Sequence, residues 1–276
     1  MAFETEIMKY EELRQRYQSL IINKMDREEY IMYNEVLFST HSCAIEGNSF
    51  SVDDTRELKE KGLGMIPAGK TLFEAFEMLD HFEAYEYMIQ HLQHPLDENL
   101  LKEINKRVTL HTLRSPDAIP GEYTTTDMAA GDTVFGDHEE LIARVPQLLE
   151  STEKAIQAVI QAKNADRKQK EATNALHPMV LAARFHGFYD YLHPFRDGNG
   201  RTGRLVCNYI LLRLGHPLLV IPSGCRNEYI SALRMIRTEA TDEHLIHFFF
   251  KMATDRMEQE IKQKKANTKR FMTFLF

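Results

Sequence analysis

The chain has 276 residues, of which 43% are hydrophobic, and a formal net charge of −7. This length and composition suit a globular protein with one large core. The acidic balance, with charges of both signs scattered along the chain, argues against a surface for nucleic acid. No apolar run approaches the roughly 20 residues of a membrane span, and the first residues lack a signal-peptide pattern. With three cysteines that lack metal-site spacing, we expect a cytoplasmic protein with free thiols that binds neither membranes nor nucleic acid.

Amphipathic helical patterns cover most of the chain, because apolar residues recur three and four positions apart. The segment that ends near Leu192 carries apolar residues such as Leu176 and Phe188 around most of its circumference, so we expect it at the centre of the core. Residues 11–46 form one or two of the expected helices, and the others cover residues 51–61, 73–93, 97–112, 139–163, 176–192, 201–214, 227–240 and 243–265.

Residues 120–138 break the helical pattern. Threonines and Val134 favour extended chain, and Ala130-Gly131-Asp132 is typical of a hairpin turn. The sequence therefore predicts an all-α fold with one small β-hairpin.

Functional residues concentrate in His193-Pro-Phe-Arg-Asp-Gly-Asn-Gly-Arg-Thr-Gly-Arg204, a loop followed by the first turn of a helix. Free backbone amides and the positive dipole end at a helix N-terminus favour an anion. Glycines allow the backbone to approach such a ligand closely. This inventory predicts a phosphate-binding site.

Several residues of this stretch suit a specific role in phosphate chemistry. His193 has an unperturbed pKa of about 6.5, which suits a general base. Asp197 supplies a hard oxygen ligand for Mg²⁺, or caps the next helix. The amides of Gly198, Asn199 and Gly200 can cradle phosphates. Arg201 and Arg204 lie three residues apart on one helical face, where Arg204 can clamp the distal phosphates.

Two alternative sites compete with this stretch. Residues 64–71 match the P-loop pattern, but the charged segment 56–61 precedes them in place of the buried strand that a P-loop needs. We therefore interpret them as a loop between helices with a solvated Lys70. His186, Asp190 and His193 recur at helical spacing and offer a metal site, although a packed core histidine and an orienting Asp190 are the simpler interpretation.

The stretch 193–204 resembles the signature of Fic-domain proteins, H-P-F-x-D/E-G-N-G-R-x-x-R, at every fixed position, and the resemblance covers most of residues 75–250. It implies a Fic fold that transfers AMP from ATP, with Mg²⁺, to a serine, threonine or tyrosine hydroxyl of a target protein. The reverse reaction, removal of AMP, and a nucleotide-binding regulator without turnover remain alternatives. The resemblance also implies that Tyr229 lines the pocket for the nucleotide.

Two further segments have counterparts in the family. The hairpin resembles the Fic flap, on which a target segment docks, here through Thr126, Asp127 and Met128; Thr124 stands where arginine is common, and the customary prolines near Asp137 are missing. The segment from Ser42 to Glu46 resembles an inhibitory motif, S/T-x-x-x-E-G/N, in which Glu46 would pair with Arg204.

The resemblance also suggests how the chain is divided. Residues 1–74 form an N-terminal helical segment with the inhibitory motif, residues 75–250 the Fic domain, and residues 251–276 a helical extension. The apolar residues 271–276 either dock on the same molecule or pair two copies as a homodimer.

Overall fold

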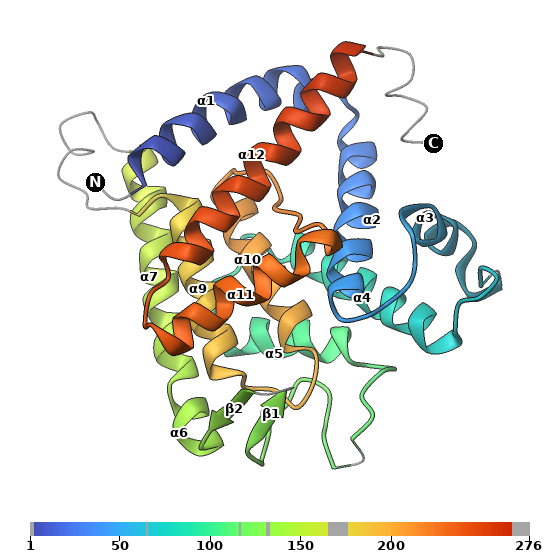
Figure 1. Ribbon diagram of the computed structural model, residues 1–276, viewed down its shortest axis with the longest axis vertical. Helices are drawn as coiled ribbons and strands as arrows, with labels where there is room; N and C mark the ends of the chain where they lie inside the picture. Colours follow the sequence, from blue (N-terminus) through green and yellow to red (C-terminus); the bar gives the residue numbers. More distant parts are fainter. Residues whose placement is uncertain (1–2, 65, 116, 131–132, 165–175, 267–276) are drawn as a thin grey trace.

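A computed structural model describes residues 3–64, 66–115, 117–130, 133–164 and 176–266 (Figure 1). Helices make up most of these ranges, and one antiparallel hairpin joins them, so the expected all-α fold with a small hairpin is confirmed. Two expectations lie outside the described residues: the tip of the hairpin at 131–132 and the docking of residues 271–276. None of the described helices combines the length and the apolar character needed to cross a membrane.

The helices follow the predicted order, with ends that differ from the expectation by a few residues. They are α1 (Glu4–Leu20), α2 (Arg27–Ile45), α3 (Val52–Lys61), α4 (Leu72–Gln90), α5 (Glu98–Val108), α6 (His138–Ala143), α7 (Val145–Asn164), α9 (Pro178–Leu192), α10 (Asn199–Arg213), α11 (Arg226–Thr238) and α12 (Glu243–Ala266), with short 3-10 helices η1 (Ile22–Lys24), η2 (Gly62–Gly64) and η3 (Ser223–Cys225).

Side-chain caps explain where several helices begin. Asp26 caps α2, and its carboxylate accepts from the amides of Glu28 and Glu29. Ser51 forms a capping box with Asp54 at the start of α3, as the sequence predicted. Such caps satisfy backbone N–H groups that have no partner inside the helix.

Helices α9 and α10 pack against each other in the centre, and α7, α11 and α12 also contact α9. Side chains of α10 such as Leu205 and Tyr209 are fully buried. The expectation that α9 is central to the core is confirmed, but Phe188 is 46% exposed and Leu176, just before the helix, is 37% exposed. Phe188 lies on the strip of α9 that its neighbouring helices leave open to solvent.

The N-terminal and C-terminal helices close one side of the molecule. In Figure 1, α1 and α12 run beside each other at the top, and α2 descends from there toward α4. The hydroxyl of Tyr17 donates to Glu260 at 2.6 Å, and Arg256 donates to Asn34 of α2 at 2.6 Å. Buried polar contacts thus fix α2 relative to the rest of the core.

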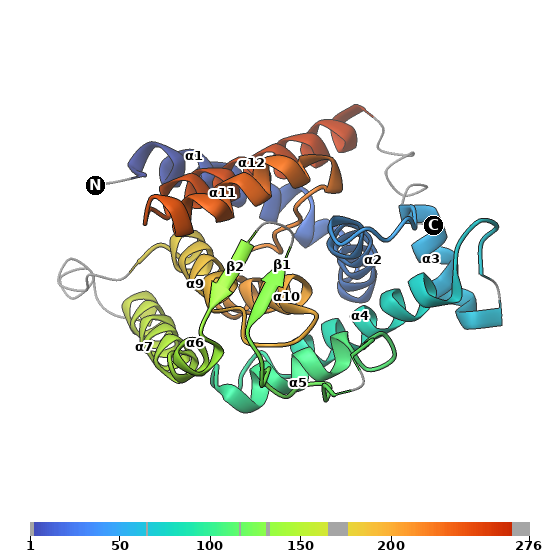
Figure 2. The same ribbon diagram turned by 60° about the horizontal axis from the view of Figure 1, so that its bottom comes forward.

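The hairpin consists of β1 (Met128–Ala130) and β2 (Thr133–Gly136). Ala129 pairs with Val134 and Met128 with Gly136, with an irregularity between the two pairs. Figure 2 shows the hairpin in front of α9 and α10. The amide of Thr124 donates to the carbonyl of Pro194 at 2.8 Å, so the segment before the hairpin is tied to the loop between α9 and α10.

Candidate active site

The loop between α9 and α10 is shaped by two left-handed residues. His193 follows Leu192 with φ 46°, and Gly198 precedes α10 with φ 75°. A side chain at position 198 would also place Cβ 2.6 Å from Cγ2 of Thr109, so only glycine fits there. Helix α10 begins at Asn199, two residues earlier than expected, and leaves its first amides free to bind an anion.

Asn199 holds the loop closed from inside. Its side chain is buried, accepts from the amide of Phe195 at 3.0 Å and donates to the carbonyl of Phe195 at 2.6 Å. The Phe195 side chain is buried as well and anchors the loop in the core. The loop geometry is therefore fixed by the signature residues themselves.

His193 lies partly exposed at the wall of a pocket. Its ring stacks on Phe135 of β2, with 3.8 Å between ring centroids and 24° between planes. Burial lowers the pKa of His193 to about 4, and the positive charge of Arg237 acts in the same direction. A hydrogen bond with the backbone of Asp190 opposes this shift. Because Nδ1 is buried, Nε2 is the nitrogen through which the neutral imidazole can accept a proton.

The pocket has a volume of about 420 Å³ and brings together six residues singled out in the sequence: Glu46, Asp190, His193, Gly200, Arg204 and Tyr229. Three further arginines, Arg226, Arg234 and Arg237, line it beside Arg204, which suits a polyanion. The other lining residues are Thr133, Phe135, Ile230 and Leu233.

Glu46, directly after α2, faces Arg204 of α10. Its Oε1 lies 2.6 Å from Nη2 of Arg204. The same guanidinium donates to Oγ and to the carbonyl of Ser42, at 3.0 and 2.9 Å. Burial raises the pKa of Glu46, but Arg204 outweighs it and the pKa is lower than usual. A Cβ at Gly200 would lie 2.3 Å from Oε1, so Glu46 reaches directly over the first turn of α10.

Arg201 points away from this pocket and braces the loop from behind. Its Nη1 pairs with Glu77 of α4 at 2.9 Å, and its Nη2 lies 3.4 Å from Oδ1 of Asp197. The Arg201 side chain is 5% exposed and does not line the pocket with Arg204. The structure thus separates the two arginines that the sequence grouped together.

Asp197 keeps one oxygen available. Oδ1 accepts from the amide of Gly198 at 2.5 Å, whereas Oδ2 makes no hydrogen bond with the described part of the chain. The Asp197 side chain is 43% exposed, and the N-cap position of α10 belongs to Gly198. A fixed, half-exposed carboxylate with a free oxygen fits Mg²⁺, which binds one or two carboxylates and keeps several waters.

The alternative metal site on α9 does not form. Nε2 of His186 is hydrogen-bonded to the hydroxyl of Tyr229 at 2.5 Å, and His186 is a buried core residue. Within the described ranges, the one cluster of three ligand atoms lies elsewhere, at Glu11, His177 and His216. Tyr229 is itself buried and lines the pocket, and the guanidinium of Arg204 lies 5.9 Å from the centroid of its ring.

The P-loop interpretation fails for the expected reason. Helix α3 and η2 precede residues 66–71, and Thr71 caps α4 through a capping box with Glu74. Lys70 is not solvated as expected, because its Nζ contacts Ser49 and lies 3.4 Å from Asp54. The free amine that a phosphate would need is already paired.

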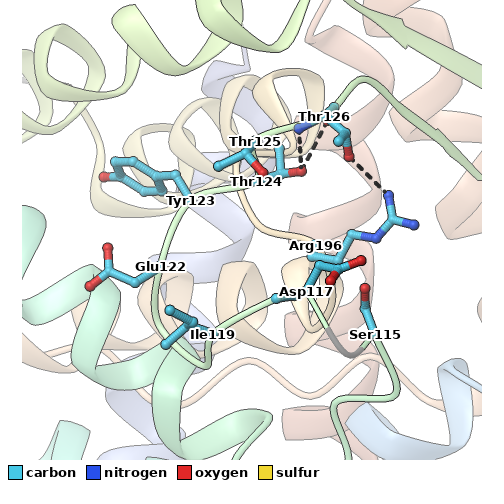
Figure 3. A pocket seen from close by; sticks show the side chains of 10 residues that line it. Ser115, Asp117, Ile119, Glu122, Tyr123, Thr124, Thr125, Thr126 and Arg196 are labelled. Atoms are coloured by element: carbon cyan, nitrogen blue, oxygen red, sulfur yellow. Dashed lines mark hydrogen bonds between the residues drawn. The ribbon is translucent and has the colours of Figure 1, made fainter.

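The predicted docking residues lie at the base of the hairpin. Figure 3 shows Thr126 at the edge of a second hollow of about 150 Å³, where Nη1 of Arg196 donates to its hydroxyl at 3.3 Å. Asp127 accepts from the backbone and from Nδ1 of His138 at 3.0 and 2.8 Å. Met128 begins β1.

Sequence reasoning missed Glu77, Phe135 and Arg237. Arg237 donates to the carbonyls of Asp190 and Tyr191 at 2.6 and 2.7 Å, at the end of the helix that precedes His193. The only signal in the sequence was at Glu77, where a charge interrupts the apolar face of α4. Burial also raises the pKa of Asp190 to about 6, beside Arg237.

Residues 95–211 match the model of the Fic/DOC family. The chain is 32% identical over 201 residues to "Protein adenylyltransferase Fic" of Drosophila grimshawi, which covers 71% of this chain and 36% of the relative. Its namesake in Nematostella vectensis is 33% identical over 199 residues, covering 70% and 41%. The chain thus spans about two fifths or less of these relatives. A Fic domain-containing signaling protein of Bacteroides thetaiotaomicron superposes with a TM-score of 0.73 and 23% identity, covering 94% and 97%.

Proposed function

Since residues 95–211 of this chain belong to the Fic/DOC family, we propose that the protein is an adenylyltransferase that transfers AMP from ATP to a serine, threonine or tyrosine hydroxyl of a target protein. The observation that carries this proposal is the pocket of about 420 Å³ into which His193, Arg204 and the N-terminus of α10 face together. It offers a base beside a site for a polyanion.

The reaction needs a proton acceptor and a place for the leaving group. The target hydroxyl gives its proton to Nε2 of His193 and its oxygen bonds to the α-phosphorus of ATP, while the bond from that phosphorus to the bridging oxygen breaks and pyrophosphate leaves. Arg204 and the amides of Gly198, Asn199 and Gly200 stabilise the negative charge on the phosphates. Asp197 would hold Mg²⁺, which neutralises phosphate charge when bound.

Glu46 is the inhibitory residue in this proposal. Its ion pair with Arg204 occupies the guanidinium that the distal phosphates would otherwise engage. ATP bound against this pair places its α-phosphorus unproductively. A side chain that competes with a ligand contact is a simple two-state switch.

Target recognition is assigned to the flap, where an extended target segment adds beside β1 near Thr126, Asp127 and Met128. In the same proposal, residues 1–74 regulate, residues 75–250 catalyse and residues 251–276 extend the domain. The proposed location is the cytoplasm, which suits three free cysteines. A second copy of the chain remains a proposed partner.

The position of Glu46 in the same pocket as His193 favours a second candidate, removal of AMP from a modified target. Water would give a proton to the Glu46 carboxylate as its oxygen bonds to phosphorus, the bond from phosphorus to the target oxygen would break, and that oxygen would take a proton from protonated His193. Release of AMP from a modified target, lost in Glu46→Gly, distinguishes this reaction from transfer.

The test uses auto-labelling with α-labelled ATP in the Glu46→Gly protein. We expect His193→Ala in that protein to lower the labelling rate by about 10²-fold or more, because the base is lost, with an unchanged melting temperature. Lys70→Ala is the control and should label normally, whereas a P-loop ATPase would lose activity. Undiminished labelling by the histidine variant contradicts the proposal, and ATP binding without any labelled protein supports the non-catalytic regulator.

A further inference from the structure

Arg237 of α11 connects three parts of the active site that are far apart in the sequence. Its guanidinium donates to the carbonyls of Asp190 and Tyr191, two of the groups that the last turn of α9 leaves without a helical partner. It also lies over the ring of Phe135, 4.4 Å from the centroid, and over the ring of Tyr191 at 4.7 Å. One side chain thus contacts both the end of α9 and the flap.

Phe135 extends this contact to the reacting group. It is 8% exposed and stacks on the imidazole of His193 at 3.8 Å. His193 follows the capped turn directly and adopts a left-handed backbone conformation, so its ring orientation depends on where that turn ends. The imidazole is therefore held by the end of α9 on its backbone side and by Phe135 on its ring side.

We propose that Arg237 is a positioning residue for the base: it fastens the last turn of α9 to β2 and thereby holds the His193 ring against Phe135. The inference rests on the proposed function, in which His193 accepts the proton. It adds that the flap, besides offering an edge to the target, sets the orientation of the base through Phe135. A target segment that seats on the flap consequently finds the imidazole already aligned.

The same arrangement has an electrostatic consequence. Charged and titratable groups face the hollows that His193 lines from several elements. They are Glu46 after α2, His138 of α6, Asp190 of α9, Arg204 of α10, and Arg226, Arg234 and Arg237 of α11. Of these, Arg237 is the cation that lowers the pKa of His193. The cation of Arg237 disfavours a second cation on the imidazole, which keeps the base neutral. Removal of Arg237 therefore changes two measurable quantities, the rate of transfer and the pH at which the base becomes protonated.

The experiment compares Arg237→Met, Arg237→Lys and Phe135→Leu in the full-length Glu46→Gly protein, with initial labelling rates from about pH 3.5 to 8 at saturating ATP. Arg237→Met should lower kcat by about tenfold and move the acid limb to higher pH by about one unit, because the imidazole loses a neighbouring cation. Arg237→Lys should keep the acid limb and recover part of kcat. Phe135→Leu should lower kcat without moving the acid limb.

The matched control is Arg184→Met, which removes another arginine contact of α9, the 2.7 Å pair with Asp242. Its kcat and acid limb should equal those of the Glu46→Gly parent. A folded Arg237→Met protein with the parent's kcat and acid limb overturns the inference. A loss of melting temperature without a displaced acid limb in Arg237→Met would reduce Arg237 to a structural role and overturns it as well.

A second measurement is independent of turnover. The imidazole of His193 can be titrated by NMR, and its pKa should rise by about one unit in Arg237→Met and stay unchanged in Arg184→Met. A parent protein that never labels itself or a target contradicts the proposed function alone. In that case the NMR titration still decides whether Arg237 controls His193, and an unchanged His193 pKa overturns the inference.

Discussion

Two arginines three residues apart on α10 each meet a carboxylate, but the two pairs differ in burial. Arg201 pairs with Glu77 at 2.9 Å, and the Glu77 side chain is only 10% exposed. Arg204 pairs with Glu46 at 2.6 Å, and the Glu46 side chain is 36% exposed at an open pocket. Glu77 also accepts from Nδ2 of Asn48 at 2.8 Å. The same chemistry therefore gives a permanent brace in one place and an exchangeable contact in the other.

The pKa values of the two acids follow the same division. Burial raises the pKa of Glu77 even though Arg201 opposes it. For Glu46 the cation of Arg204 prevails and the pKa is lowered. Burial therefore works against the charged form of Glu77, even with Arg201 beside it. For Glu46 the neighbouring Arg204 favours the charged form.

The largest effect is expected from breaking the buried pair. Glu77→Ala leaves the buried Arg201 with only the longer, 3.4 Å contact to the half-exposed Asp197. It should lower the free energy of unfolding by about 3–5 kcal/mol, as measured by urea denaturation. Glu77→Gln retains a hydrogen-bonding partner for Asn48 and should lose less. A loss under about 1 kcal/mol in Glu77→Ala would show that the two pairs are equivalent in stability.

Breaking the pair of Glu46 and Arg204 should instead change the rate of labelling. Glu46→Gly frees Arg204 for phosphate and should raise auto-labelling by about 10- to 100-fold, which corresponds to about 1.4–2.8 kcal/mol. The free energy of unfolding should fall by less than in Glu77→Ala, because the Glu46 side of the pair is open to solvent and Arg204 keeps its two hydrogen bonds to Ser42. Equal labelling by the variant and the unchanged protein would remove Glu46 from the inhibitory role.

The smallest effect is expected from a change of pH on the inhibition by Glu46. A carboxylate with a lowered pKa keeps its ion pair above its usual titration range and loses it only as the pH falls through the lowered value. The ratio of labelling by Glu46→Gly to labelling by the unchanged protein should therefore stay constant from pH 8 to 5.5. A ratio that falls within this window would mean that another group controls the pair.

The sequence predicted what depends on neighbouring residues. The helices, the capping box at Ser51 and the hairpin follow from local spacing and turn chemistry, and the signature residues His193 to Arg204 lie in one segment. The sequence did not predict contacts between residues that only the packing of distant segments brings together. Phe135 and Arg237 approach His193 from 58 residues before it and 44 residues after it, and no local pattern marks either of them. Phe188 was misplaced because periodicity cannot tell which strip of a helix its neighbours leave open.

Anchors on both sides of Glu46 set how fast the contact with Arg204 can exchange. Arg226 donates to the carbonyl of Ile45 at 2.7 Å, just before Glu46, and Asn48, two residues after it, donates to Glu77. Opening the pair thus requires rotation of one partly exposed side chain and leaves α2 in place. Such rotations take picoseconds to nanoseconds, whereas helix movements take microseconds to milliseconds. Inhibition should consequently act as a rapid equilibrium that lowers the population of productive ATP poses, without a slow opening step before each turnover.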